Sequence, residues 1–133
     1  MALAYPDRSR RTVLVADDDA ALRETLADIL DEGYFVLQAA DGEEALRQVL
    51  RRPVDVLILD MAMPKRDGIS VLQALGPPPP KVIVLSAFAY YSPEDIDRMG
   101  LGRKVTRAFQ KPAPPAELLA AVAEAVEELG KDN

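Results

Sequence analysis

Four apolar runs in this chain each end at a residue whose side chain suits phosphoryl chemistry. The first run ends at Asp17 and Asp18, the second at Asp60, the third at Ser86 and the fourth at Lys111. If the runs are parallel strands of one sheet, all four ends open onto the same edge. Ligands bind at this carboxyl edge in open α/β sheets, so these side chains would meet in one crevice.

The acids in this set favour a bound metal ion. Adjacent carboxylates at the end of a buried strand repel each other, and they need a cation in order to lie close together. Hard divalent ions with oxygen ligands suit Asp17, Asp18 and Asp60, and Mg²⁺ suits them best. Asp19 follows the pair directly, and we expect it to cap the next helix instead.

The ammonium of Lys111 and the hydroxyl of Ser86 favour a phosphoryl group as the guest of this crevice. The metal and the ammonium would share the charge of that group, and the hydroxyl would donate to one of its oxygens. A carboxylate such as that of Asp60 can act as a nucleophile and form an acyl phosphate. These residues therefore predict phosphoryl transfer to an aspartate.

The composition excludes several other kinds of site. The chain has 133 residues, 49% of them hydrophobic, which suffices for one domain with a sizeable core. It has no cysteine, hence no disulfide or thiol nucleophile, and no histidine, hence no Ser-His-Asp triad. Any histidine in phosphotransfer must therefore come from another protein. A net charge of −6 argues against direct nucleic-acid binding, and no apolar window could span a bilayer, so we expect a cytoplasmic protein.

The hydropathy pattern predicts the elements that position these residues. Strands are expected at residues 13–16, 34–39, 54–59, 82–85 and 105–110. The third of these runs is apolar at all but one position, as expected for a central parallel strand covered on both faces. Helical periodicity follows each strand. Five strands alternating with five helices predict an α/β fold with a doubly wound, five-stranded parallel sheet.

A single domain is expected over residues 12–129. Residues 1–11 carry basic side chains without an apolar core, which indicates a flexible N-terminal arm rather than a secretory signal. Residues 130–133 are expected to form a C-terminal tail. Residues 76–80, a glycine followed by four prolines, cannot form a helix and are expected to be an extended connector.

At these residues the chain resembles the receiver domain of two-component response regulators, the chemotaxis-regulator-like fold. The matching segments are VLVADDD, DVLILDMAMPKRDG, VIVLSA and FQKP. They stand in order at the ends of the expected strands, and the similarity extends over about Thr12 to Leu129. The resemblance implies a flavodoxin-like three-layer sandwich with strand order 2-1-3-4-5.

The resemblance also implies roles for the residues of the crevice. Asp60 corresponds to the phosphoacceptor, and it would bind the metal ion together with Asp17 and Asp18. The main-chain carbonyl of Ala62 would be a further metal ligand. Lys111 corresponds to the phosphate-binding lysine, which acts in catalysis together with Asp60.

A conformational switch is implied as well, in which Ser86 corresponds to the hydroxyl that responds to the phosphoryl group. In the family an aromatic residue usually stands three residues before the lysine and turns inward on activation. Here that position is Ala108, and Phe109 is expected to face the opposite side of its strand. The apolar segment 88–91 is the nearest substitute, so we expect phosphorylation to reorder residues 86–104 more than any other segment.

The resemblance implies a signalling function. A partner histidine kinase or histidine phosphotransfer protein would phosphorylate Asp60 in a Mg²⁺-dependent reaction. The changed surface would control an output partner or output domain that the sequence does not identify, and the function is compatible with a homodimer. The domain would turn over only its own phosphoryl group and would not be an enzyme with a separate substrate.

Two other functions stay open at this point. A degenerate receiver would dock a partner without phosphorylation; the intact acceptor set argues against it, and the missing aromatic at Ala108 argues for it. A Mg²⁺-dependent phosphatase of the haloacid-dehalogenase type also uses a nucleophilic aspartate. That chemistry typically needs a second acid two residues after the nucleophile, where this chain has Ala62.

Overall fold

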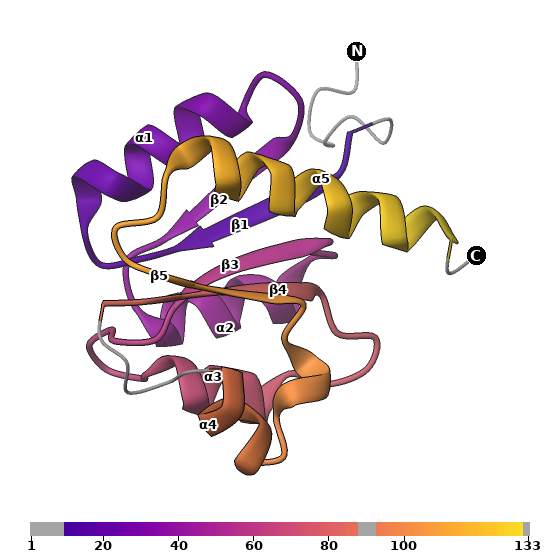
Figure 1. The fold of residues 1–133 in the computed structure, drawn as a ribbon. Helices are drawn as coiled ribbons and strands as arrows, with labels where there is room; N and C mark the ends of the chain where they lie inside the picture. Colours follow the sequence, from indigo (N-terminus) through magenta and orange to yellow (C-terminus); the bar gives the residue numbers. More distant parts are fainter. Residues whose placement is uncertain (1–9, 88–92, 132–133) are drawn as a thin grey trace.

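Five parallel strands form a single sheet in the order β2-β1-β3-β4-β5. The computed structural model describes residues 10–87 and 93–131 (Figure 1). The strands are β1 Thr12–Ala16, β2 Phe35–Ala39, β3 Val56–Asp60, β4 Lys81–Ser86 and β5 Arg107–Gln110. Every neighbouring pair is parallel. The predicted α/β fold and its strand order are therefore confirmed.

Helices cover both faces of this sheet and give the predicted three-layer sandwich (Figure 1). They are α1 Ala20–Leu30, α2 Gly42–Arg51, α3 Gly68–Ala74, α4 Pro93–Arg98 and α5 Pro115–Lys131, with a 3₁₀ helix η2 at Gly102–Lys104. Helices α1 and α5 lie on one face, and α2, α3 and α4 lie on the other. Within the described ranges, no helix is both long and apolar enough to cross a membrane.

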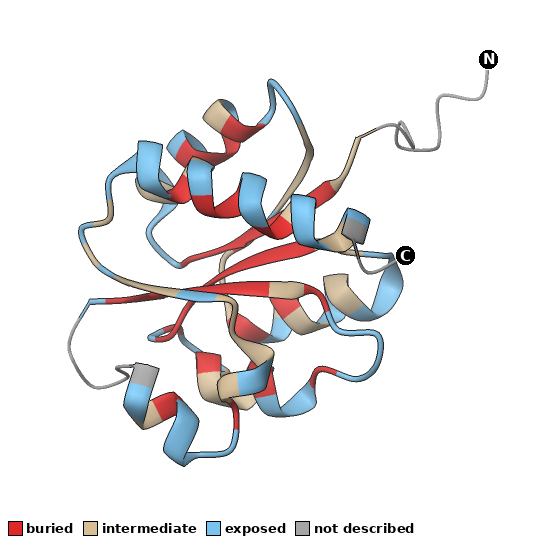
Figure 2. Ribbon diagram, turned by 45° about the vertical axis from the view of Figure 1, so that its right-hand side comes forward, coloured by how far each residue is buried: buried red, intermediate tan, exposed pale blue. Residues whose placement is uncertain are grey.

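The sheet separates two apolar cores, and its central strands belong to both. Every residue of β1 and β3 is buried, as predicted for parallel strands covered on both faces. Because side chains alternate along a strand, Leu14 and Leu57 pack toward α2 and α3, whereas Val13 and Val56 pack toward α1 and α5. Figure 2 shows the same division, since the buried residues of the helices lie on the sides turned toward the sheet.

Some elements begin or end at residues other than those predicted. Strand β5 begins at Arg107 rather than Val105, because the Val105 N–H donates to the carbonyl of Gly102 at the end of η2 (3.2 Å). Strand β3 likewise begins two residues later than predicted. Helix α5 continues to Lys131, and so it includes the first two residues of the segment expected to be a tail.

Aspartates cap three of the helices that leave the carboxyl edge. The side chains of Asp19, Asp41 and Asp67 each accept a hydrogen bond from the backbone N–H three residues further on, at 3.2, 2.8 and 2.9 Å. Such a cap satisfies a free N–H of the first turn and favours the positive end of the helix dipole. The predicted capping role of Asp19 is confirmed. The three caps fix the loops that follow β1, β2 and β3.

The two central residues of β5 face opposite sides of the sheet. Ala108 packs against the core beneath α4, and Phe109 packs against the core beneath α5. The predicted orientation of Phe109 is therefore confirmed. The segment 88–91, expected to substitute for an aromatic at Ala108, lies outside the described residues.

The start of α2 leaves no room for a side chain at Gly42. A Cβ atom there would lie 1.8 Å from the carbonyl oxygen of Arg66, which is backbone and cannot turn away. We predict that Gly42→Ala lowers the free energy of unfolding by about 1–3 kcal/mol, as overpacking typically does. Urea denaturation measures the change, and Gly33→Ala, with nothing within 4 Å, is the control. Equal stability of the two variants would contradict this close approach.

Candidate functional site

The predicted site residues meet at the carboxyl edge of the sheet. Asp17 directly follows β1, Asp60 ends β3, Ser86 ends β4, and Lys111 directly follows β5. Asp17, Asp18 and Asp60, here called the acidic cluster, each place a carboxylate oxygen within 4.8 Å of the other two. The parallel-strand argument therefore predicted the meeting of these acids correctly.

Asp17 is fully buried and is held through both its main chain and its side chain. Its N–H donates to the carbonyl of Ala39 at the end of β2 (3.0 Å), and its Oδ1 accepts from the N–H of Asp19 (2.9 Å). Its Oδ2 lies 2.8 Å from the Nζ of Lys111, although the angles are not those of a hydrogen bond. The contact is an ion pair, because opposite charges at this distance attract strongly at any angle, and it leaves lone-pair capacity on Oδ2.

Asp60 lies beside Asp17, and both of its carboxylate oxygens have a partner. Only 2% of the residue is exposed. Its Oδ1 accepts a hydrogen bond from the N–H of Ala62 (3.2 Å), and its Oδ2 lies 3.4 Å from the Nζ of Lys111. The carboxylate is thus held in one orientation at the end of a central strand.

The surroundings of Asp60 make its carboxyl less acidic than usual. Burial raises the pKa of Asp60 to about 6, and the negative charge of Asp17 adds to the increase. The hydrogen bond from Ala62 and the charge of Lys111 oppose the increase without cancelling it. At neutral pH the carboxyl is mostly ionised, yet its oxygens are more basic than those of an exposed aspartate.

Lys111 supplies the ammonium that contacts both buried carboxylates. Its backbone N–H donates to the carbonyl of Ser86 (2.7 Å), which holds the end of β5 next to the end of β4. Burial by itself lowers the pKa of Lys111, but the contacts with Asp17 and Asp60 outweigh burial and the pKa is raised. Lys111 therefore stays protonated throughout the neutral pH range.

The acidic cluster fits a hard divalent cation. One ammonium cannot neutralise three carboxylates, and the Oδ2 of Asp17 accepts no hydrogen bond from the described residues. Asp17 and Asp60 are buried while Asp18 is exposed, so the cluster is open to solvent on one side. Carboxylate oxygens supplemented by water are the ligands that Mg²⁺ prefers.

Ala62 and Ser86 lie where the resemblance places them, and their roles stay predictions. Ala62 is exposed, and it contacts Asp60 through its N–H. Ser86 is buried, with 8% of its surface exposed, at the end of β4. Asp19 is not part of the acidic cluster, because its carboxylate caps α1.

Arg23 belongs to this edge, and the sequence analysis missed it. Its Nη1 donates to the main-chain carbonyl of Asp17 (2.8 Å), and its Nε donates to the Oε1 of Gln38 on β2 (3.1 Å). The guanidinium therefore ties the first turns of α1 to the loop that carries the acidic cluster. The sequence offers only a weak signal, because an arginine one turn into an amphipathic helix is usually solvated.

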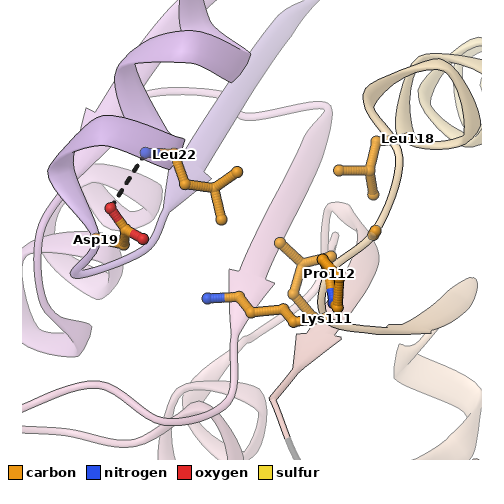
Figure 3. A pocket seen from close by; sticks show the side chains of 7 residues that line it. Asp19, Leu22, Lys111, Pro112 and Leu118 are labelled. Atoms are coloured by element: carbon orange, nitrogen blue, oxygen red, sulfur yellow. Dashed lines mark hydrogen bonds between the residues drawn. The ribbon is translucent and has the colours of Figure 1, made fainter.

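An apolar pocket of about 360 Å³ lies next to Lys111. In Figure 3, Leu22 of α1 and Leu118 of α5 lie on opposite sides of this pocket, with Lys111 and Pro112 below them. The hydrogen bond between Asp19 and the N–H of Leu22 fixes the α1 side. The apolar walls lower the local dielectric on one flank of the ammonium, which strengthens its attraction for anions.

Comparisons with known proteins give this site a family context. The family model of the response regulator receiver domain matches residues 13–123. The response regulator GtcR of Aneurinibacillus migulanus is 35% identical over 115 residues, which are 84% of this chain and 46% of that protein. The transcriptional regulatory protein CpxR of Klebsiella pneumoniae is 39% identical over 113 residues, which are 83% of this chain and 47% of that protein.

A solved structure shows the same fold. The response regulator receiver domain protein (CheY-like) of Methanospirillum hungatei has a TM-score of 0.81 at 26% identity, and the match covers 93% of this chain and 99% of that chain. By contrast, the chain spans less than half the length of the two curated relatives. The likeness to them therefore concerns one part of longer proteins.

The raised pKa of Asp60 should make the stability of the metal-free protein depend on pH. The pKa of Asp60 is about 6 in the folded chain, against 3.8 for an ordinary aspartate. Folding therefore favours the protonated carboxyl, and this contribution to stability is lost as the pH rises from about 4 to about 6. At pH about 7.5 and with a chelator present, we predict that Asp60→Asn raises the free energy of unfolding by roughly 1–2 kcal/mol. This is less than the full pKa shift would give, because solvent near Asp60 screens part of the effect.

Near pH 4 the same substitution should change stability far less, because the folded wild type is already protonated there. Urea denaturation at the two pH values gives the comparison. Asp28→Asn, at an exposed position of α1, is the control and should have the same effect at both. An equal gain from Asp60→Asn at both pH values would show that burial does not raise this pKa.

Proposed function

Because this chain belongs to the response regulator receiver domain family, we propose that it accepts a phosphoryl group on Asp60 and thereby controls an output partner. Response regulators of two-component systems interact with histidine kinases and output domains. In this proposal the acidic cluster holds Mg²⁺, and Lys111 and Ser86 bind the phosphoryl group. The domain turns over only its own phosphoryl group.

The surroundings of Asp60 are the main support for its proposed role as the phosphoacceptor. Its carboxylate ends a central strand, lies 3.4 Å from the Lys111 ammonium and is oriented by the Ala62 N–H. Its raised pKa, about 6, gives a more nucleophilic oxygen than an ordinary aspartate has while the group stays mostly ionised at neutral pH. Asp17 lies closer to the same ammonium, at 2.8 Å, and it corresponds in the family to a metal carboxylate rather than to the acceptor.

The transfer forms one bond and breaks one. A carboxylate oxygen of Asp60 attacks the phosphorus of a phosphohistidine, and the phosphorus–nitrogen bond breaks as the phosphorus–oxygen bond forms. The imidazole nitrogen keeps the electron pair of the broken bond. Because this chain contains no histidine, the donor belongs to a histidine kinase or a histidine phosphotransfer protein. Acetyl phosphate can stand in as the donor, with acetate as the leaving group.

Neutralising negative charge is the main contribution of the site to this transfer. Mg²⁺ held by Asp17, Asp18, Asp60 and the main-chain carbonyl of Ala62 would supply positive charge to the transferring oxygens. Lys111 supplies a second positive charge, and its contacts with the buried carboxylates keep it protonated. Asp17 and Asp60 in turn hold the Lys111 ammonium beside the acidic cluster.

The response to phosphorylation begins at the end of β4. The hydroxyl of Ser86 turns toward the phosphoryl group. The main-chain carbonyl of Ser86 accepts a hydrogen bond from the N–H of Lys111 (2.7 Å), which links the ends of β4 and β5. Ala108 has no ring that could follow the hydroxyl, so the change passes to residues 86–104. A phosphoryl group shifts this equilibrium only through contacts that differ between the two states.

The output lies outside the receiver fold in this proposal. The two curated relatives are regulators, and this chain matches less than half of each. We therefore infer that this receiver acts on an output domain or a separate partner, and that it does not bind nucleic acid itself. A net charge of −6 supports the last point, since nucleic-acid binding depends on phosphate neutralisation.

Asp60→Asn should abolish phosphoryl acceptance while leaving the fold intact. The amide is isosteric with the carboxylate but is a far poorer nucleophile. After incubation with Mg²⁺ and acetyl phosphate, intact-mass spectrometry should find one phosphoryl group on the wild type and none on the variant. Circular dichroism of the variant controls for folding. Equal labelling of variant and wild type would refute the assignment.

The same experiment separates the alternatives. Continuous release of phosphate by the wild type, many times per chain, would indicate a phosphatase. No adduct on the wild type would indicate a receiver that docks a partner without phosphorylation.

Mg²⁺ should stabilise the folded chain through the acidic cluster. An ion that binds the native state alone stabilises by mass action, so about tenfold excess over Kd should raise Tm by roughly 2–5 °C. Asp18→Ala should erase the increase, whereas Asp19→Asn should retain it, because asparagine also caps a helix and Asp19 is outside the cluster. The measurement is a thermal melt with Mg²⁺ and with a chelator. A full increase in the Asp18→Ala variant would contradict the metal role.

A further inference from the structure

A groove of about 590 Å³ lies at the edge of the sheet opposite the acidic cluster. It is lined by residues 49–55, which lead from α2 into β3, by residues 76–80, which lead from α3 into β4, and by Leu129 near the end of α5. We call it the proline groove. Figure 1 shows these segments at the end of the molecule where α5 finishes. Strands of five residues, about 15–20 Å long, separate the groove from Asp60.

The proline groove exposes apolar surface that the fold itself does not use. Leu50 is 74% exposed, the largest value for a large apolar side chain in the described residues. Residues 77–79 are exposed prolines, whereas Leu75 and Pro80 on either side are buried and anchor the connector. A single exposed leucine is ordinary, but a leucine and three prolines that line one groove together form an exposed apolar strip.

Unpaired positive charge borders this strip. Arg51 and Arg52 line the groove and are exposed, and neither has an acidic partner among the described residues. The nearby acids are engaged elsewhere. Asp55 pairs with Arg11 (3.4 Å) and accepts from the N–H of Thr12 (2.8 Å).

A second acid near this end of the molecule is also engaged, since Glu128 pairs with Lys81 (3.6 Å). The rim of the proline groove is therefore net positive, although the whole chain carries −6. A negative partner would gain from the two arginines and would not be repelled by an uncompensated acid at the rim.

We propose that the proline groove docks an acidic segment of a partner protein, whose apolar side chains contact Leu50 and residues 77–79 while its carboxylates pair with Arg51 and Arg52. Prolines have a fixed φ, so the connector loses little conformational entropy when it is covered. Two arginines suit a short acidic peptide, whereas nucleic acid requires several phosphate contacts, which the net charge opposes. The groove lies a full strand length from Asp60 and shares no lining residue with the acidic cluster, so docking does not require the function proposed above.

The test is a titration of the ¹⁵N-labelled full chain with a peptide in which glutamates alternate with leucines, followed by heteronuclear NMR. We expect shifts in the amide resonances of residues 49–52 and 76, and none at Asp60. Arg51→Glu combined with Arg52→Glu should weaken binding by about tenfold or more, since each rim charge contributes a few-fold. Leu50→Ala should weaken binding as well, which tests the apolar contact without a change of charge.

Arg103→Glu is the control for each single Arg→Glu change, because it reverses the charge of an exposed residue of η2 that does not line the groove. It should bind the peptide as the wild type does, and so should Asp60→Asn. A peptide with lysine in place of glutamate should cause no shifts in the groove.

Several results would overturn the proposal. Unchanged affinity in the double arginine variant would do so, as would shifts that map to another surface. Equal binding of the lysine peptide or of duplex DNA would show that the groove does not select an acidic protein segment. Peptide binding that appears only after removal of residues 1–9 would assign the groove to the chain's own N-terminus. Concentration-dependent dimerisation lost in Leu50→Ala would assign it to a second copy.

Discussion

The burial of two carboxylates against a single ammonium is the constraint on which this structure depends. Asp17 and Asp60 are almost completely removed from solvent, and Lys111 is the cation that contacts both. Burying charge is costly unless it is paired, and one lysine leaves the acidic cluster with an excess of negative charge. Burial raises the pKa of Asp60, and the charge of Asp17 adds to the increase. The excess of negative charge makes a divalent cation the natural complement of the cluster. In the proposed function, the Mg²⁺ that offsets this excess would also supply positive charge to the incoming phosphoryl group.

The rest of the fold keeps this unfavourable arrangement in place. Parallel pairing delivers the ends of β1, β3, β4 and β5 to one edge, and the buried central strands allow little movement. Capping aspartates fix the loops after β1 and β3, and Arg23 ties the first of these loops to α1 and β2. At the opposite edge of the sheet, Arg51 and Arg52 have no acidic partner among the described residues. There the connector 76–80 and the end of α2 leave apolar surface and two arginines exposed, which is the arrangement of a binding surface.

The architecture and the acidic cluster could be predicted from the sequence because both depend on short-range patterns. Buried parallel strands read as apolar runs, and the residue that ends each run is fixed by adjacency in the chain, so the meeting of Asp17, Asp60 and Lys111 follows from topology alone. The role of Arg23 depends on the packing of α1 against β2, which no local pattern specifies. The late start of β5 also depends on a contact that no local pattern specifies, because the N–H of Val105 donates to the carbonyl of Gly102 in η2. The proline groove was also missed, since it requires three segments far apart in sequence to lie side by side.

We propose that the buried carboxylate of Asp60, at the end of β3, is the group that becomes phosphorylated. Borohydride reduces an aspartyl phosphate to homoserine, so reduction after treatment with Mg²⁺ and acetyl phosphate, followed by peptide mass spectrometry, locates the acceptor directly. We expect homoserine in place of Asp60 and at no other aspartate, and no product when a chelator replaces Mg²⁺. Reduction at Asp17 or Asp18, or a phosphate that resists borohydride and maps to Ser86, would contradict it.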